Sequence, residues 1–317
     1  MKQDTQSQIS RLRCGEPLAL ARAISAVENR APGWSELLKA LFPHTGKARI
    51  IGLTGAPGSG KSTLVDQLAK LYRKENQTVG IIAVDPTSPY TGGAILGDRI
   101  RMQDHYNDPG IYIRSMATRG SLGGLARTTA DVATVLDASG RDLILIETVG
   151  VGQDEVDIVR LADVTVVMLV PGMGDDVQTI KAGIMEIADI FVINKSDREG
   201  AERVEREIRA MQSLATRNDG WTPPIVKTVA SEGLGTKELA GAIADYEAYL
   251  KKENLVFKKN VENWQERLVE MLRDAMLEKA RAQMEGGSVA RYAAEIAEHK
   301  RDPYTLVEEI VAKVGQR

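Results

Sequence analysis

One short stretch, residues 52–63 with the sequence GLTGAPGSGKST, constrains the fold of this chain more than any other. It contains Gly55-x-x-x-x-Gly60-Lys61-Ser62, follows the run Arg-Ile-Ile at 49–51 and precedes a helical pattern. This spacing, between a strand and a helix, is typical of a phosphate-binding loop. Glycines let the backbone curl so that successive N–H groups reach phosphate oxygens without a colliding Cβ. The sequence therefore predicts a nucleoside triphosphate site here.

The residues of this loop have distinct expected roles. We expect Lys61 to reach the β- and γ-phosphates and act in catalysis, and the Ser62 hydroxyl to ligate Mg²⁺. The N-terminal end of the following helix adds a positive dipole at the same place. The predicted nucleotide-binding residues of the loop are Gly55, Ala56, Pro57, Gly58, Ser59, Gly60, Lys61, Ser62 and Thr63.

Short β-branched runs alternate with longer amphipathic stretches from residue 48 onward. We expect strands at 49–53, 78–84, 111–115, 143–146, 164–170, 190–193 and 225–229. Helical patterns lie between most of them, for example at 62–73, 125–136 and 202–214. Near-continuous apolar strands that alternate with helices predict an α/β fold with a mostly parallel central sheet, covered on both faces.

The ends of the chain follow a helical pattern instead. We expect a helical N-terminal extension over residues 1–46, a nucleotide-binding domain over 47–252 and a C-terminal helical arm over 253–317. In the arm, apolar residues recur at alternating steps of three and four, which predicts a helical seam. That seam could pack on its own domain or form a surface for a second copy or a partner. Its residues are Val261, Trp264, Leu268, Met271 and Ala275.

A second motif, DLILIETVG at 142–150, leads a buried strand into the carboxylate of Glu147. We expect Glu147 to hold the metal or its water, and the N–H of Gly150 to bond a γ-phosphate and release it after hydrolysis. Glu147 could instead be a solvated carboxylate at a strand end. Two further acidic candidates for the magnesium shell, Asp85 and Asp98, lie in the polar segment after residue 84, although Asp85 could equally cap a turn.

The motif IFVINKSD at 190–197 predicts which base is bound. Asn194-Lys195-x-Asp197 after a buried strand is a guanine reader, because the carboxylate of Asp197 accepts from hydrogens that adenine does not present. We therefore expect GTP and GDP, not ATP, as the nucleotides. At the end of the next strand, we expect Val229, Ala230 and Ser231 to offer backbone N–H groups to the guanine carbonyl.

Composition argues against several other classes of protein. The 317 residues carry a formal net charge of −3 with interspersed signs, which is unlike a nucleic-acid binder. The single cysteine, Cys14, and three scattered histidines make a soft-metal site improbable. The apolar stretch 164–170 is too short to span a bilayer, and the N-terminus looks unlike a secretory or Arg-rich transit peptide. We expect no nucleic-acid or membrane partner, and a location in the bacterial cytosol.

Taken together, these motifs closely resemble the methylmalonyl-CoA mutase-associated G proteins, the MeaB/ArgK group that includes the methylmalonic aciduria type A protein. The resemblance rests on GAPGSGKST, VDPTSPYTGGAILGDRIRM, RSMATRGSLGGLARTT, ETVGVGQDE, PGMGDDVQTIKAGIMEIAD and NKSD, within residues 50–240. It implies a Mg²⁺-dependent GTPase of the SIMIBI class that works as a homodimer.

The resemblance also implies a partner, an adenosylcobalamin-dependent mutase of the methylmalonyl-CoA or isobutyryl-CoA type. The GTPase would gate cofactor loading and protect or reactivate that mutase. Gln178 and Lys181 resemble the family's additional switch, which carries the nucleotide state to the mutase. They lie three residues apart, on one face of a predicted helix, and could also be an ordinary exposed helix start.

Three rival interpretations remain open at this level. One is a metal-insertase GTPase, which would need the Cys and His ligands that this chain lacks near the nucleotide motifs. Another is a kinase-like component of lysine, arginine and ornithine transport, against which the guanine reader argues. The third is a structural module that binds nucleotide without any difference between GDP and GTP.

Overall fold

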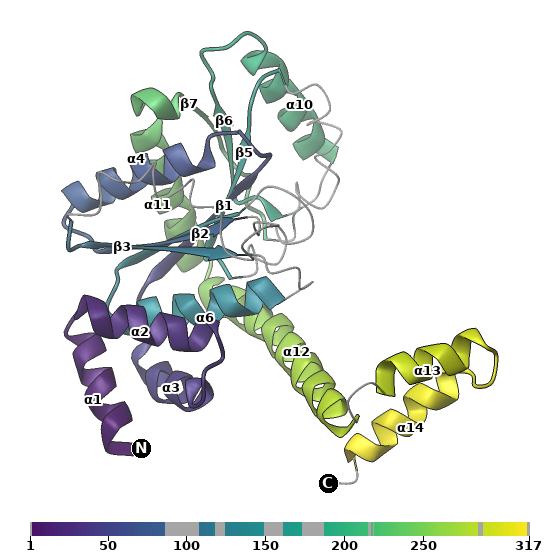
Figure 1. The fold of residues 1–317 in the computed structure, drawn as a ribbon. Coiled ribbons are helices and arrows are strands. Elements are labelled where there is room, and N and C mark those ends of the chain that lie inside the picture. The colour runs from purple at the N-terminus through teal and green to yellow at the C-terminus, as the bar shows by residue number, and fades with distance from the viewer. Residues whose placement is uncertain are drawn as a thin grey trace. The chain divides into compact units, whose positions relative to one another are not determined.

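The computed structural model of the chain describes most of the 317 residues (Figure 1). The described residues are 2–85, 108–117, 124–148, 161–172, 187–214, 217, 219–284 and 288–315. The chain divides into two compact units, Met1–Phe257 and Lys258–Arg317, and each is described by itself.

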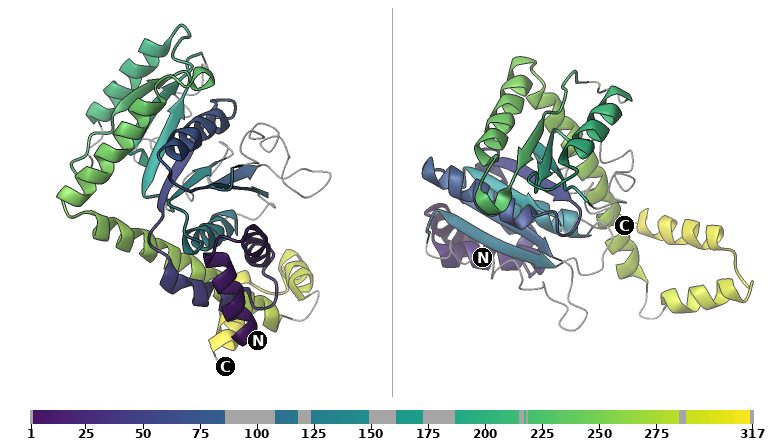
Figure 2. Two further views of the ribbon diagram at one scale, coloured as in Figure 1. Left: turned by 90° about the vertical axis from the view of Figure 1, so that its left-hand side faces the viewer. Right: turned by 90° about the horizontal axis from the view of Figure 1, so that it is seen from above.

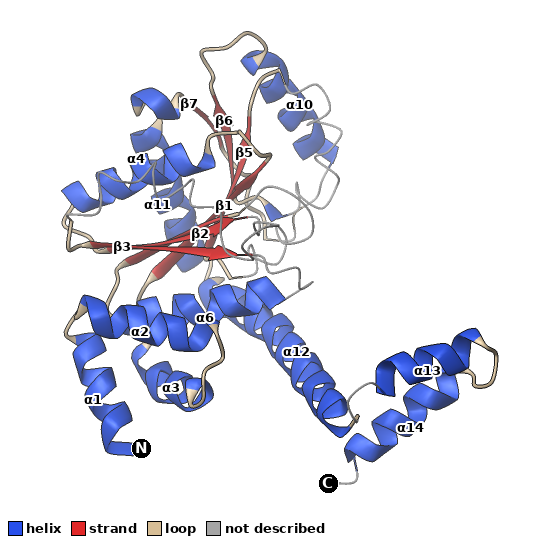
Figure 3. Ribbon diagram, in the orientation of Figure 1, coloured by secondary structure: helices blue, strands red, loops and turns tan. Residues whose placement is uncertain are grey.

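A parallel sheet forms the centre of the first unit (Figure 3). Its strands are β1 (Arg49–Gly55), β2 (Val79–Asp85), β3 (Ile111–Ala117), β4 (Leu143–Glu147), β5 (Val164–Leu169), β6 (Ile190–Asn194) and β7 (Ile225–Thr228). They lie in the order β3-β2-β4-β1-β5-β6-β7, and every described pairing is parallel. The predicted fold class is confirmed, and each predicted strand lies within two residues of an observed one at either end.

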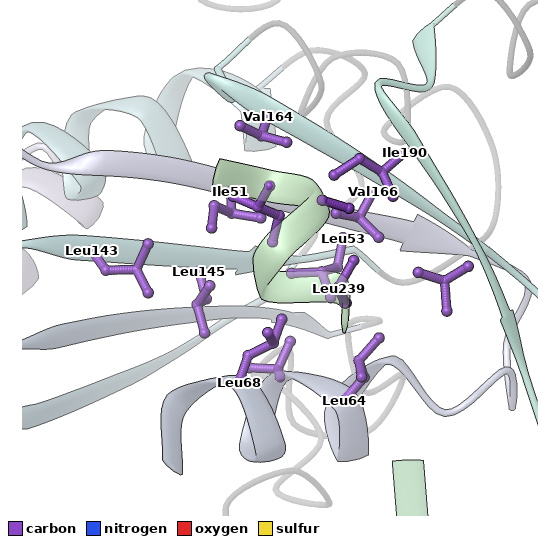
Figure 4. Packing of buried hydrophobic residues seen from close by; sticks show 14 of the residues in the cluster. Ile51, Leu53, Leu64, Leu68, Leu143, Leu145, Val164, Val166, Ile190 and Leu239 are labelled. Carbon is purple, nitrogen blue, oxygen red and sulfur yellow. The ribbon is translucent and has the colours of Figure 1, made fainter. Parts of the chain in front are cut away.

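Helices cover both faces of this sheet, as the two further views show (Figure 2). On one face, α4 (Lys61–Lys74) and α11 (Thr236–Lys252) pack against alternate residues of the central strands. Leu64, Leu68 and Leu239 there meet Leu53 and Leu145 (Figure 4). Since residues at even spacing on a strand share one face, the intervening strand residues point to the opposite layer.

That opposite layer contains α6 (Gly124–Ala138), together with the N-terminal helices. These are α1 (Lys2–Arg13), α2 (Pro17–Glu28) and α3 (Trp34–Leu41), followed by the short turn η1 (Phe42–His44). Their buried side chains belong to the same apolar cluster as Ile144 and Ile146 of β4. The N-terminal helices thus share a core with the sheet through residues between Ile9 and Leu41. Farther along the sheet, α10 (Ala201–Leu214) packs against β5 and β6.

A buried carboxylate fixes the junction between the N-terminal helices and β1. Asp137, near the end of α6, accepts backbone hydrogen bonds from Gly46 at 2.5 Å, Lys47 at 3.1 Å and Ala48 at 3.0 Å. Three consecutive amides that lack secondary-structure partners are thereby satisfied, as buried backbone groups require. This contact ties the linker to α6 directly before the strand that leads to the phosphate-loop motif.

The C-terminal region is helical, with α12 (Val256–Gln283), α13 (Ser288–Ala297) and α14 (Pro303–Gly315). Asp302 caps α14, because its carboxylate accepts from the amide of Thr305 at 2.8 Å. Apolar side chains on α12 are substantially exposed, Trp264 at 44% and Leu268 at 55% among them. None of the described helices combines the length and apolar character that a bilayer crossing requires.

Candidate nucleotide-binding site

The phosphate-loop motif lies between β1 and α4, where two of its glycines face close neighbours. Gly55 has a φ of +144°, and a Cβ there would lie 2.3 Å from the carbonyl oxygen of Met168 on β5. Gly60 has a φ of +96°, and its Cβ would lie 2.4 Å from the side-chain nitrogen of Asn194. Both separations are far below van der Waals contact. Contacts with the neighbouring strands β5 and β6 therefore also require glycine at positions 55 and 60.

Lys61 begins α4 and is almost fully buried, with 5% of its surface exposed. Its ammonium donates to the carbonyls of Gly55 at 2.6 Å and Ala56 at 3.0 Å. The charge is thus held beside the loop and at the N-terminal end of α4, where backbone N–H groups favour an anion. Ser59, fully buried beside them, has an Oγ for which no hydrogen-bond partner is found among the described atoms.

Ser62 and Glu147 meet across the end of the sheet. The Ser62 hydroxyl donates to the Glu147 carboxylate at 2.6 Å, and both residues are buried. Glu147 is the last residue of β4 and lies opposite Leu53 of β1 in the parallel register. The Ser62 hydroxyl and the Glu147 carboxylate lie beside the phosphate-loop motif and are oxygen donors of the kind that Mg²⁺ prefers. Mg²⁺ takes few protein ligands beside phosphate oxygens and water.

Asn194, the last residue of β6, connects three parts of the site. Its side-chain nitrogen donates to the carbonyl of Ser59 at 2.7 Å. Its side-chain oxygen accepts from the Thr228 hydroxyl and from the amide of Ala230, both at 3.0 Å. Asn194 has 2% of its surface exposed, so its side chain is a buried hydrogen-bonded link between the phosphate loop and the end of β7.

Lys195 strengthens the same connection from the surface. Its φ of +55° lies in the left-handed region, which non-glycine residues seldom adopt. Its ammonium donates to the carbonyl of Gly58 at 2.8 Å. Asp197, two residues later, has an exposed side chain in the turn after β6. In the Asn-Lys-x-Asp motif, Asn194 and Lys195 thus donate hydrogen bonds to the phosphate loop, and the carboxylate of Asp197 faces solvent.

The segment after β7 is folded back tightly. The amide of Val229 donates to the carbonyl of Leu234 at 3.1 Å, and Ala230 begins the short helix η3 (Ala230–Glu232) with its amide on Asn194. Two of the three amides expected to face guanine therefore have partners within the protein. Ser231 is the third.

Several predicted residues lie outside the described part of the chain. β2 ends at Asp85, whose backbone is described but whose side chain is not. The remaining ones are Asp98, Gly150, Gln178 and Lys181. Those that the structure does bring together come from the ends of β1, β4, β6 and β7 and from the start of α4.

Two buried threonines beside the site are not among the residues that the sequence predicts. The hydroxyl of Thr148 donates to that of Thr54 at 3.1 Å. Thr54 precedes Gly55, and Thr148 follows Glu147. The only signal in the sequence is this adjacency, because a threonine in a strand is by itself unremarkable.

Comparisons with known proteins agree with this geometry. The profile of one family, described as Methylmalonyl Co-A mutase-associated GTPase MeaB, matches residues 20–285. A relative from Pyrococcus abyssi, whose name assigns it provisionally to the GTPases, is 48% identical over 309 residues, which cover 96% of this chain and 95% of the relative. GTPase ArgK of Escherichia coli is 39% identical over 250 residues, 76% of each chain.

Two further matches extend the range of relatives. The mouse protein named methylmalonic aciduria type A homolog, mitochondrial, is 36% identical over 251 residues, which cover 74% of this chain and 60% of that protein. The crystal structure of a protein named LAO/AO transport system kinase matches with a TM-score of 0.73 at 27% identity, over 99% of this chain and 98% of the other.

Proposed function

Because the chain belongs to the MeaB family of methylmalonyl-CoA mutase-associated GTPases, we propose that its GTP hydrolysis serves an adenosylcobalamin-dependent acyl-CoA mutase. The chain is a GTPase that binds guanine nucleotides. As a chaperone of the mutase, it gates cofactor loading and protects or reactivates the enzyme. The single observation that carries this proposal is the family match over residues 20–285, which includes the whole described nucleotide site.

The triphosphate binds in the loop between β1 and α4 in this proposal. Backbone N–H groups of residues 55–63, apart from Pro57, which has none, surround the phosphates, and Lys61 neutralises charge on the β- and γ-phosphates. Lys61 already lies against this loop, on the carbonyls of Gly55 and Ala56, so little reorientation brings its ammonium to a bound anion. The buried hydroxyl of Ser59 offers another polar group at this position.

Mg²⁺ would be held by Ser62 and Glu147, whose oxygens lie 2.6 Å apart, with Asp85 and Asp98 in the outer shell. When bound, the ion withdraws charge from the phosphate oxygens during transfer to water. Glu147 orients Ser62 by accepting a hydrogen bond from its hydroxyl, which leaves the lone pairs of the serine oxygen available for the ion. This arrangement fits the residues present, since all the ligands are hard oxygen donors.

Guanine would be selected by Asp197, with Lys195 and the amide of Ser231 beside the base. Asn194 has a different task, because both ends of its amide group are already used in holding the phosphate loop to β7. Asn194 therefore shapes the pocket, and Asp197 reads the base edge. Adenine would leave that carboxylate unpaired, which is the basis of discrimination against ATP.

Communication with the mutase would run through Gly150, Gln178 and Lys181, and the chain would act as a homodimer in the bacterial cytosol. A kinase-like role in amino-acid transport, which also appears in the name of one structurally similar protein, is not favoured. Nor does a nickel or cobalt insertase gain support, since the described residues contain no group of three His, Cys, Asp or Glu side chains that could hold a metal.

The test uses purified methylmalonyl-CoA mutase and isobutyryl-CoA mutase, each titrated with the full-length chain in the presence of GDP or a non-hydrolysable GTP analogue. The expected result is that the chain binds one of the mutases with clearly different affinities in its GDP-bound and GTP-analogue-bound states. A ligand with equal effect on both states could not regulate anything. Equal affinity with either nucleotide, or no binding to either mutase, would refute the proposal.

The variant Asp197→Asn supplies the matched control. It should exchange guanine for xanthine preference, because the amide then complements the O2 of xanthine. The variant should respond to xanthosine nucleotides as the natural protein responds to guanosine nucleotides, while guanosine nucleotides no longer change its affinity for the mutase. This exchange separates nucleotide signalling from a loss of folding.

A further inference from the structure

A pair of buried hydroxyl groups joins the strand of the phosphate loop to the strand of Glu147. Thr54 and Thr148 are exposed to 1% and 2%, and the Thr148 hydroxyl donates to the Thr54 hydroxyl at 3.1 Å. Thr54 lies directly before Gly55, and Thr148 directly after Glu147. The two residues thus flank the places where β1 and β4 turn into the site.

A backbone bond reinforces the same junction. The amide of Thr148 donates to the carbonyl of Leu53 at 3.1 Å, one residue beyond the end of β4. Leu53 is also the register partner of Glu147. Together, the backbone bond and the hydroxyl bond hold the residue after Glu147 against β1. Glu147, whose carboxylate oxygen lies 2.6 Å from the Ser62 hydroxyl oxygen, is the residue directly before this junction.

Packing alone gives no reason for hydroxyl groups at these positions. Valine has nearly the same shape as threonine and favours strands equally. It also has no polar group that loses a hydrogen bond to water when it is buried. A buried hydroxyl, in contrast, destabilises the protein by about 1–3 kcal/mol whenever its partner is missing. Two such groups that bond one another fix a direction as well as a distance, which two methyl groups cannot do.

We propose that Thr54 and Thr148 are positioning residues for GTP hydrolysis. Their hydroxyl bond sets the Glu147 carboxylate against Ser62. The proposal rests on the function proposed above, in which Ser62 and Glu147 hold Mg²⁺. The pair acts through Glu147 and touches neither the base nor the phosphates.

The experiment compares full-length Thr148→Val, Thr54→Val and the double variant with the unaltered protein. GTP turnover is measured over a range of Mg²⁺ concentrations, and GDP affinity is measured in EDTA with a fluorescent guanine nucleotide. Each single change should lower kcat and raise the Mg²⁺ concentration for half-maximal rate by about 5- to 10-fold, the size expected for one lost hydrogen bond. GDP affinity in EDTA should change less than about twofold, because the altered groups act only through the metal carboxylate.

Non-additivity is the second readout. If the two hydroxyls act only through each other, the double variant should behave like either single variant, whereas independent sites would multiply their effects. Thr148→Ser keeps the hydroxyl and should restore the Mg²⁺ response. Should valine at 148 prevent folding, Thr148→Ala and Thr148→Ser provide the same comparison, and only the alanine variant should need more Mg²⁺.

A matched control is Thr129→Val on α6, which removes another fully buried hydroxyl, one that donates to the sulfur of Met116 at 3.9 Å. It should leave the Mg²⁺ response unchanged. The proposal is overturned if the variants at 54 and 148 show an unchanged Mg²⁺ response, multiplied effects in the double variant, or an equal loss of GDP affinity in EDTA. If the unaltered protein hydrolyses GTP without Mg²⁺, a result visible before any variant is made, the magnesium site proposed above is wrong and this inference is wrong with it.

Discussion

Replacement of Asn194 by alanine should uncouple the phosphate loop from the rest of the site. The change removes three hydrogen bonds, of 2.7, 3.0 and 3.0 Å, from a side chain that is 2% exposed. An unsatisfied buried group destabilises by about 1–3 kcal/mol, and entry of water recovers part of this, so we expect a loss of about 3 kcal/mol. For a folded unit of this size, that loss lowers Tm by roughly 6–12 °C.

The assay is thermal unfolding followed by circular dichroism, paired with titration of GDP. Thr228→Val removes one of the three bonds and should lower stability by about 1 kcal/mol, a third of the effect. The control Asn29→Ala alters an exposed side chain at the end of α2 and should stay within about 0.5 kcal/mol of the unaltered protein. GDP affinity should fall with Asn194→Ala by about tenfold or more, which corresponds to about 1.4 kcal/mol.

The graded series gives a clear criterion. If Asn194→Ala lowers Tm no more than Asn29→Ala does, the three contacts contribute nothing to stability. Asn194 would then not hold the phosphate loop to the end of β7. If stability falls while GDP affinity is unchanged, Asn194 supports the fold without shaping the nucleotide pocket.

Three other changes follow from the structure. Gly55→Ala should prevent stable folding of the first unit, because its Cβ would press on a backbone carbonyl of β5. Gly140 has a φ of +85° and open space around it, so Gly140→Ala should lower the free energy of unfolding in urea by only about 1 kcal/mol. Asp137→Ala should lower the urea midpoint by an amount equal to about 2–4 kcal/mol, since three amides lose their acceptor, and Asp137→Asn, which keeps one oxygen, should lose less. The amide and hydroxyl of Thr78 hold the pKa of Asp142 below its ordinary value, so this carboxylate stabilises the fold above the unfolded pKa near 4 and the stability is lost as pH falls through the lower folded value. Acid titration of unfolding should therefore be less steep in Asp142→Asn, and an identical slope in both proteins would refute the linkage.

The sheet could be predicted from the sequence because its strands are apolar on both faces. Runs such as 143–146 and 190–193 have no alternation of polar and apolar residues, and helical patterns separate them, which leaves few architectures other than a parallel sheet. Strand ends are harder to predict. Strand β1 continues to Gly55, two residues beyond its predicted end, because it pairs there with β5. Tertiary pairing, which no local pattern contains, sets such boundaries.

Other features depend on contacts between distant parts of the chain. The sequence predicts that Asn194 binds nucleotide, and it gives no sign of the bonds from this side chain to Ser59 and Ala230, which span 135 and 36 residues of sequence. The helix α1 has a polar sequence, so its periodicity is weak, although Leu12 is fully buried. In both cases, the side chain's role is decided by what packs against it, and a single sequence does not reveal those neighbours.

The function proposed above separates recognition of the base from detection of the γ-phosphate. Asn194 and Lys195 attach the guanine motif to the phosphate loop through contacts within the protein, on Ser59 and Gly58. These contacts do not involve the third phosphate, so base recognition should contribute equally to GDP and GTP binding. In the proposed function, the difference that the mutase senses then arises in segments after β2, β4 and β5, which contain Asp98, Gly150, Gln178 and Lys181 in sequence. A ligand regulates only through such a difference, so variants in those segments should alter the ratio of GTP to GDP affinity, while variants at Asn194 should lower both together.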